Sequence, residues 1–225
     1  MTIAHPLVIF DVEGTLVDST ALTIRLWQET LQSFGFEFPL ATLQRHSGQD
    51  SHDMLHALIP GPHVSRVVPR ILKAKGQRYR DKYLPRVAAF PEVRALFERV
   101  KRAGQTTAVA TSSSADELDQ YLALTHAGHL VDAVACGEDV ERDKPGSALI
   151  EDALLRTGRM APEQAVVIGD TAYDAMAARR AGVAAIGLLS GGFSRDDLEG
   201  SGCIAVYRDP ADLLARYGET GRLQA

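Results

Sequence analysis

Short, continuous apolar runs recur along the chain and predict the strands of a buried sheet. They read LVIFDV at 7–12, TTAVAT at 106–111, DAVAC at 132–136, AVVIGD at 165–170 and VAAIGLL at 183–189. Because the runs are apolar throughout rather than alternating, both faces of the sheet should be covered. Helically spaced stretches separate the later runs, which predicts an α/β fold: a Rossmann-like parallel sheet with helices on both faces.

The interval between the first two runs breaks this rhythm, because 13–105 is far longer than an ordinary crossover connection. A separate segment is therefore inserted there. Apolar residues spaced by three and four predict an amphipathic helix over 22–34, with Ser19 or Thr20 as its N-cap and Gly35 as its end.

Two more apolar stripes continue the helical pattern. One covers 54–59, and a longer one covers 64–83 and should be interrupted at Pro69. The two connections to the sheet would lie side by side and form a hinge. We therefore expect two domains: an inserted small α-helical cap domain at residues 18–88, and a core domain made of residues 1–17 and 89–225.

The net charge of -5 and the pI near 5.8 disfavour nucleic acid and anionic membranes as partners, since both are bound mainly through clustered cations. Cys136 and Cys203 have no metal-type spacing and are expected to be reduced core thiols. The N-terminus lacks a basic segment followed by a long apolar one, so we expect a cytoplasmic protein. The sequence leaves monomer and homodimer open.

Polar side chains close several of the apolar runs. Asp11, Thr111 and Asp170 stand at three such ends, and ligands of open parallel sheets bind outside the carboxyl ends of the strands. After the third run, Pro145 pushes Lys144 toward an extended conformation, from which its ammonium group would reach the same crevice. These residues define the predicted site.

The crevice would hold the carboxylates of Asp11, Glu13, Asp170 and Asp174 together with the Lys144 ammonium group. Oxygen ligands of this kind suit Mg²⁺. Four carboxylates would repel one another without a cation, whereas a divalent ion and Lys144 together would let the site receive a phosphate. Phosphoryl transfer is therefore the favoured hypothesis.

The motifs DVEGTLVDS, VATSS, DKPGS and VIGDTAYDAMAARRAG, in this order, resemble those of the haloacid dehalogenase (HAD) superfamily. The resemblance covers nearly the whole chain. It is to the branch with a helical C1-type cap, which includes phosphoglycolate phosphatases and β-phosphoglucomutases. It implies a Mg²⁺-dependent phosphatase that hydrolyses small phosphorylated metabolites.

The resemblance also implies roles. Asp11 would attack the phosphoryl group and form an aspartyl-phosphate that water hydrolyses, and Glu13 would be the general acid and base. Most capped phosphatases of the family carry Asp at this second position, although enolase-phosphatases also read D-x-E-G-T. Asp170 would ligate Mg²⁺ with Asp11 and the Glu13 carbonyl, while Asp174 would hold the metal's waters or favour a helix N-terminus.

Other residues are assigned to the phosphate and the leaving group. The resemblance implies that the Thr111 hydroxyl and Ser112 NH bind phosphate, that Lys144 neutralises it, and that Thr15 fixes the loop beside Asp11. In the cap, the loop at Gly48 occupies a position that faces the substrate in related proteins. Its specificity candidates are Arg45, His46 and Gln49.

Three other functions remain open from the sequence. A phosphomutase of the β-phosphoglucomutase kind would deliver the phosphoryl group to a second hydroxyl, and a haloacid dehalogenase would use the same nucleophile without a metal. In a non-catalytic phospholigand-binding protein, the Glu at residue 13 would have abolished turnover. The identity of the phosphorylated substrate follows no code that the cap sequence reveals.

Overall fold

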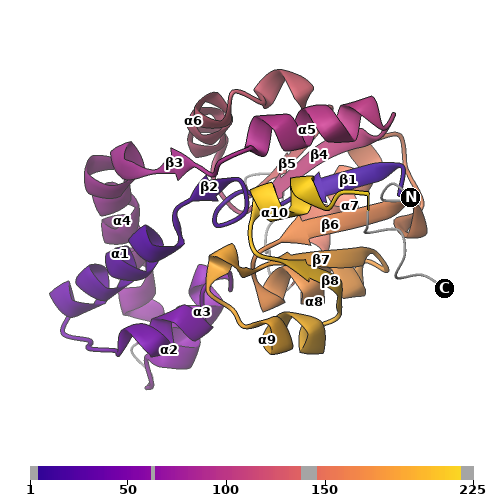
Figure 1. Ribbon diagram of the computed structural model, residues 1–225. Coiled ribbons are helices and arrows are strands. Elements are labelled where there is room, and N and C mark those ends of the chain that lie inside the picture. The colour runs from indigo at the N-terminus through magenta and orange to yellow at the C-terminus, as the bar shows by residue number, and fades with distance from the viewer. Residues whose placement is uncertain (1–4, 62–63, 138–145, 219–225) are drawn as a thin grey trace.

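The computed structural model describes residues 5–61, 64–137 and 146–218. Six parallel strands form the central sheet in the order β5-β4-β1-β6-β7-β8, which confirms the predicted parallel sheet (Figure 1). Strand β8 is an addition that the sequence pattern did not predict. The strands are β1 (Leu7–Phe10), β4 (Thr106–Thr111), β5 (Ala133–Cys136), β6 (Ala165–Gly169), β7 (Ala184–Leu188) and β8 (Cys203–Tyr207).

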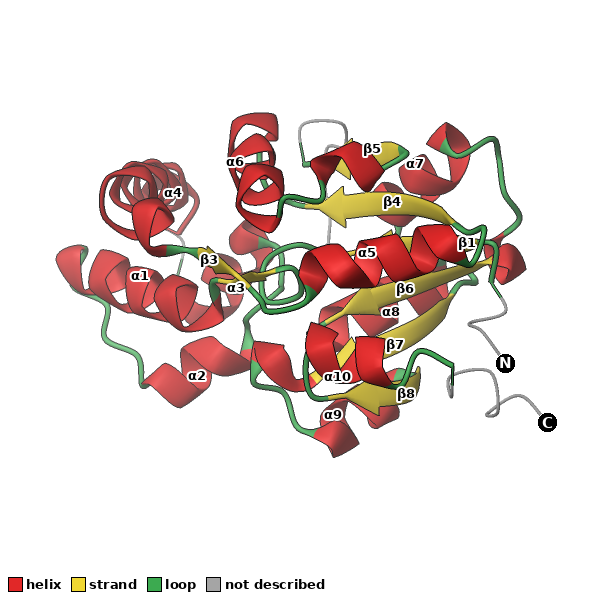
Figure 2. Cartoon of the chain, turned by 45° about the horizontal axis from the view of Figure 1, so that its top comes forward, coloured by secondary structure: helices red, strands yellow, loops and turns green. Residues whose placement is uncertain are grey.

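Helices cover both faces of this sheet (Figure 2). Successive side chains of a strand point to opposite faces of the sheet, and in β1 all of them are apolar. Val8 and Phe10 pack into one hydrophobic core and Leu7 and Ile9 into another, so each face needs a layer of helices. The first core takes in α5 (Val93–Arg102), α6 (Ala115–Thr125) and α10 (Pro210–Ala215). The second takes in α7 (Ala148–Arg156), α8 (Ala172–Arg180) and α9 (Arg195–Ser201).

The segment inserted after β1 is helical and has a hydrophobic core of its own, centred on Trp27, Leu31, Leu55 and Ile71. In Figure 1 it lies to the left of the sheet. We call this helical unit the cap. Its helices are α1 (Thr20–Ser33), α2 (Leu40–Arg45), α3 (Ser51–Leu58) and α4 (Val64–Arg78).

The predicted interruption at Pro69 is wrong, because α4 runs through this residue. Pro69 lies near the start of the helix, where its missing NH removes a single intrahelical hydrogen bond. The helix changes instead at its end, where a π-helical turn over Tyr79–Tyr83 and a 3-10 turn over Leu84–Arg86 lead back to the sheet.

Two short strands join the cap to the rest of the chain. Strands β2 (Val17–Asp18) and β3 (Ala88–Ala89) are antiparallel, with Val17 opposite Ala89. The Phe90 NH also donates to the Leu16 carbonyl at 3.0 Å. The two connections therefore lie side by side, as expected of a hinge, while the domain boundaries at 17/18 and 88/89 stay a prediction.

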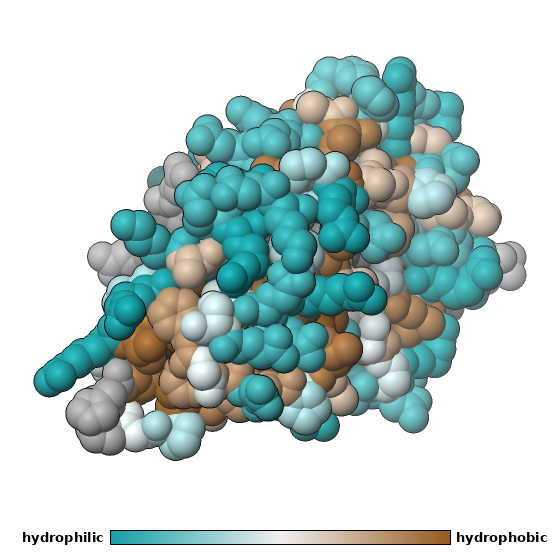
Figure 3. Space-filling model, turned by 90° about the vertical axis from the view of Figure 1, so that its left-hand side faces the viewer, coloured by the Kyte–Doolittle hydropathy of each residue, from teal (hydrophilic) through white to brown (hydrophobic). Residues whose placement is uncertain are grey.

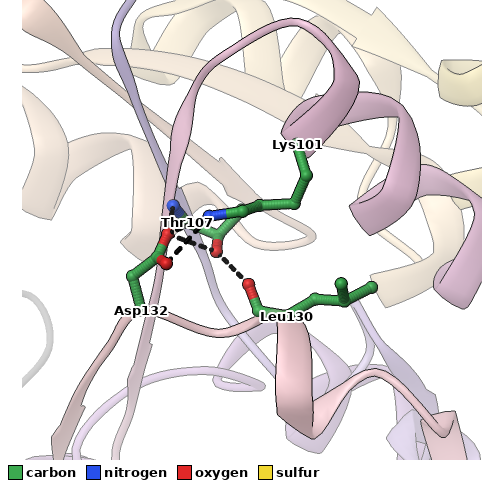
Figure 4. A network of polar contacts seen from close by, with 4 residues as sticks. All are labelled: Lys101, Thr107, Leu130 and Asp132. Atoms are coloured by element: carbon green, nitrogen blue, oxygen red, sulfur yellow. Dashed lines mark hydrogen bonds and ion pairs between the residues drawn. The ribbon is translucent and has the colours of Figure 1, made fainter.

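A polar network fixes the loop before β5 at the opposite end of the sheet from the strand-end carboxylates (Figure 4). The Asp132 carboxylate accepts from the Thr107 NH at 2.8 Å and pairs with the Lys101 ammonium group at 2.6 Å. Burial alone would raise the pKa of Asp132, but the hydrogen bonds from Lys101 and Thr107 outweigh it and hold this pKa below its ordinary value. The network is structural and lies far from the predicted site.

The surface on the side of the cap is mostly hydrophilic, with hydrophobic side chains gathered toward its lower part in Figure 3. Cys136 and Cys203 are both buried, in agreement with the prediction of core thiols. Among the described residues, the helices are too short or too polar for any of them to cross a membrane.

Candidate active site

The three aspartates of the sequence motifs meet at the carboxyl ends of two neighbouring strands. Asp11 follows β1, Asp170 follows β6, and Asp174 lies in the first turn of α8. The chain leaves β1 toward β4 but leaves β6 toward β7, so the crevice between β1 and β6 is the topological switch point at which open sheets bind ligands. One carboxylate oxygen of each aspartate lies within 4.8 Å of the others.

Hydrogen bonds from neighbouring side chains hold two of these carboxylates. Thr15 donates its hydroxyl to Asp170 Oδ1 at 2.9 Å. Asp174 Oδ2 accepts from the Thr171 NH at 3.0 Å and from the Thr171 hydroxyl at 2.7 Å, which caps α8. Thr15 therefore supports Asp170, and Asp174 takes part in the cap of α8 while its carboxylate lies in the cluster; its role in holding the waters of a metal stays a prediction.

Two glycines allow the backbone to approach Asp170 closely. A Cβ atom at Gly14 or at Gly191 would lie 2.1 Å from Asp170 Oδ2. Gly14 also has φ +83°, which residues with a side chain rarely adopt. The packing around Asp170 therefore has no room for another atom on these two sides.

This cluster fits a hard divalent cation. Asp11, Asp170 and Asp174 are 6%, 1% and 4% exposed, so their mutual repulsion is poorly screened by water. A cation ligated by carboxylate oxygens removes that repulsion, and three oxygens with space for water or phosphate suit Mg²⁺. The Glu13 side chain, by contrast, is not part of the cluster.

The residues predicted to bind phosphate lie beside the carboxylates. Thr111 and Ser112 line one pocket with Asp11 and Asp170. The Thr111 hydroxyl donates to the Ser113 hydroxyl and accepts from the Ser113 NH, both at 3.2 Å. Lys144 lies outside the described residues, so its predicted role stays a prediction.

The two serines that follow Ser112 have different roles. Ser114 is the N-cap of α6 in a capping box with Glu117. Ser113 instead donates to Glu13 Oε2 at 3.2 Å, and the Tyr121 hydroxyl donates to Glu13 Oε1 at 3.4 Å. Both oxygens of Glu13 are therefore held by side chains, and the carboxylate lines the same pocket as Asp11.

The cap forms the outer wall of this pocket. His46 and Gln49 line it and contact each other, with 2.6 Å between His46 Nδ1 and Gln49 Oε1. Arg45 does not line it: its side chain is exposed, while its carbonyl accepts from the Tyr173 hydroxyl at 3.2 Å. The structure therefore brings two of the three cap candidates to the pocket.

Several pocket residues were not predicted as site residues from the sequence. Ser19, the N-cap of α1, and Thr23 and Trp27 within α1 line the pocket from one side of this helix, and their four-residue spacing is a signal that was available. The hydroxyl oxygens of Ser19 and Thr23 are buried without a hydrogen-bond partner in the described part of the chain. Lys75 of α4 also lines the pocket, with its Nζ 5.2 Å from the Trp27 ring centroid.

Comparison with known proteins agrees with this geometry. The family of haloacid dehalogenase-like hydrolases matches residues 8–188. A phosphoglycolate phosphatase of Caulobacter vibrioides is 28% identical over 91% of this chain and 87% of its own length, and the pyrophosphatase PpaX of Bacillus velezensis is 26% identical over 80% and 82%.

A solved structure shows the same fold. The crystal structure of a hydrolase from Pseudomonas syringae has a TM-score of 0.84 and 28% identity, and the match covers 94% of this chain and 97% of that one. The family match covers well over half of the chain and includes the strand ends that carry Asp11, Thr111 and Asp170. The resemblance inferred from the motifs is therefore confirmed, and the chain belongs to the haloacid dehalogenase-like hydrolases.

Proposed function

We propose that this hydrolase is a Mg²⁺-dependent phosphatase that cleaves small phosphomonoesters through an aspartyl-phosphate on Asp11. The observation that carries the proposal is the cluster of Asp11, Asp170 and Asp174 at the switch point, in one pocket with Thr111 and Ser112. The relatives named as a phosphoglycolate phosphatase and a pyrophosphatase support phosphate ester or anhydride chemistry.

In the first step, a carboxylate oxygen of Asp11 forms a bond to phosphorus while the bond to the leaving oxygen breaks. Glu13 gives its proton to that oxygen, and the alcohol departs. Thr111 and Ser112 hold the phosphoryl oxygens. Mg²⁺ held by Asp11, Asp170 and the Glu13 carbonyl, with Asp174 beside it, would offset the negative charge of the carboxylates and of the phosphoryl group.

In the second step, the ionised Glu13 takes a proton from water, and the water oxygen attacks the phosphorus of the aspartyl-phosphate. The bond between phosphorus and the Asp11 oxygen then breaks, which frees phosphate and restores the carboxylate. The cap excludes bulk water during these steps by covering the pocket with His46 and Gln49.

The pocket wall suggests the class of leaving group. Lys75 supplies a cation, and Ser19 and Thr23 supply two hydroxyls with no partner among the described side chains and backbone. A short alcohol that carries a carboxylate or hydroxyl groups would satisfy all three. The proposed substrate is therefore a small phosphomonoester of the 2-phosphoglycolate type.

Phosphate release from a panel of phosphorylated metabolites in the presence of Mg²⁺ tests this function. We expect release from small carboxylated or polyhydroxylated phosphomonoesters, and loss of release in EDTA. A phosphomutase would instead isomerise a sugar phosphate with catalytic bisphosphate and without net release. Activity that survives complete chelation would contradict the role of the metal.

A further inference from the structure

Two buried tyrosines connect Glu13 to the cap. Tyr121 belongs to α6 and is fully buried, and Tyr79 is the first residue of the π-helical turn that follows α4 and is 4% exposed. The Tyr121 hydroxyl donates to Glu13 Oε1 at 3.4 Å, and the Tyr79 hydroxyl is hydrogen-bonded to that of Tyr121. A continuous row of polar groups therefore runs from the cap to the carboxylate.

The direction of these hydrogen bonds follows from the donor count. A phenol carries one hydrogen, and Tyr121 uses its hydrogen to donate to Glu13, so its oxygen accepts from Tyr79. Burial, and then the charge of Glu13, raise the pKa of both tyrosines above the ordinary value, which keeps both hydroxyls protonated. Both hydroxyls act as donors directed toward Glu13.

The length of the Glu13 side chain explains why its carboxylate needs such support. Glutamate has one more rotatable bond than the aspartate usual at this position, so more conformational freedom must be removed to place its carboxylate. Ser113 fixes Oε2 and Tyr121 fixes Oε1, and both of these side chains belong to the sheet domain rather than the cap. The hydrogen bond between Tyr79 and Tyr121 connects these anchors of Glu13 to the cap.

We propose, on the basis of the proposed phosphatase function, that Tyr121 is a positioning residue for Glu13 and that Tyr79 makes this positioning depend on a docked cap. A hydroxyl that accepts a hydrogen bond is a stronger donor, so Tyr79 strengthens the bond from Tyr121 to Glu13. When the cap swings out at the β2–β3 hinge, this support is removed. The Glu13 carboxylate is therefore fully positioned only when the cap covers the substrate.

The leaving-group dependence of Tyr121→Phe tests the positioning role. An alkyl phosphate such as 2-phosphoglycolate needs protonation of its leaving oxygen, whereas p-nitrophenyl phosphate scarcely does. We expect Tyr121→Phe to lower kcat on 2-phosphoglycolate by roughly tenfold to a hundredfold. On p-nitrophenyl phosphate the loss should be less than about threefold, with KM little changed on both substrates.

The cap connection is tested by combining variants. We expect Tyr79→Phe to give a smaller loss, about threefold, with the same leaving-group dependence, and the double variant to be no worse than Tyr121→Phe alone. Tyr83→Phe is the matched control, because Tyr83 lies in the same π-helical turn, is 1% exposed, and has the Glu29 and Lys82 side chains as neighbours. It should leave the ratio of the two rates unchanged.

Each outcome has a distinct meaning. If the unmodified protein hydrolyses neither substrate, the proposed function fails and this inference fails with it. If it is active but Tyr121→Phe lowers both rates equally or neither, the positioning role is wrong while the function stands. Additive losses in the double variant would refute the link to the cap. Should Tyr121→Phe not fold, Ser113→Ala removes the other anchor and must give the same leaving-group signature.

Discussion

Gly191 offers a perturbation of Asp170 whose size can be worked out from the structure. It lies in the 3-10 turn Leu189–Gly191 that follows β7, and its backbone is not in the left-handed region. A Cβ atom there would lie 2.1 Å from Asp170 Oδ2 and 2.3 Å from the Asp170 carbonyl oxygen. Gly191→Ala therefore adds a steric conflict with Asp170 without adding backbone strain.

Neither partner in this conflict moves easily. Asp170 is 1% exposed and its other carboxylate oxygen accepts from Thr15, while the turn is held by Gln44, which donates to the Gly191 carbonyl at 2.6 Å. Ordinary contact begins at 3.4 Å. The carboxylate or the turn must therefore shift by more than about 1 Å, a misplacement that can cost about a hundredfold in rate.

The assay is phosphate release over a range of Mg²⁺ concentrations. We expect Gly191→Ala to lower kcat/KM by about a hundredfold or more and to raise the Mg²⁺ concentration needed for half-maximal activity. Gly200→Ala is the matched control, because Gly200 lies in α9 and a Cβ atom there would meet nothing within 4 Å among the described residues outside its own helix. If Gly191→Ala matches the control in rate and Mg²⁺ requirement, Asp170 is not the ligand we infer.

Three further predictions concern the metal, the cap and the stability of the fold. Ca²⁺ should inhibit in competition with Mg²⁺, because its longer bonds and higher coordination number misplace the nucleophile; equal rates in the two metals would refute this. Lys75→Met should raise KM for 2-phosphoglycolate about tenfold, because the substrate carboxylate loses its cation, and should leave KM for p-nitrophenyl phosphate within about twofold. Equal changes in KM for the two substrates would show that Lys75 does not recognise the leaving group. Asp132→Asn should cost about 1 kcal/mol of unfolding free energy at pH 7 after allowance for solvent screening. Folding lowers the pKa of Asp132, so the contribution of its carboxylate to stability is complete above pH 3.8 and is lost as the pH falls through the pKa of the folded state. The difference in unfolding free energy between Asp132→Asn and the unmodified protein should therefore shrink when both are measured in acid.

The sheet and its strand-end carboxylates could be predicted because their pattern is local. An apolar run that ends in a polar residue specifies both a buried strand and the residue at its carboxyl end, as with Phe10 followed by Asp11. Strand β8 was not predicted because it lies at the sheet edge, where Ile204 is 39% exposed and the strand is not uniformly buried. Helix α2 was not predicted either, because its six residues are too few to show a helical period.

Apart from His46 and Gln49, which the family resemblance indicated, most of the cap side of the pocket depends on how the cap docks. Lys75 and Tyr79 lie in a helical stretch whose polar and apolar spacing indicates only which face is buried. Tyr121 lies at an apolar position of α6 and belongs to the core, yet its hydroxyl reaches Glu13. Contacts of this kind arise from tertiary packing, and no local pattern encodes them.

The central claim is that Asp11 forms a covalent aspartyl-phosphate, and one measurement tests it directly. The protein is mixed with substrate and Mg²⁺, quenched in acid within one turnover and reduced with borohydride, which converts an aspartyl-phosphate to homoserine. Mass spectrometry should find homoserine at residue 11, and Asp11→Asn should show neither this product nor more than about a thousandth of the turnover. Full turnover without modification at residue 11, or near-normal rates in a folded Asp11→Asn protein, would contradict the account.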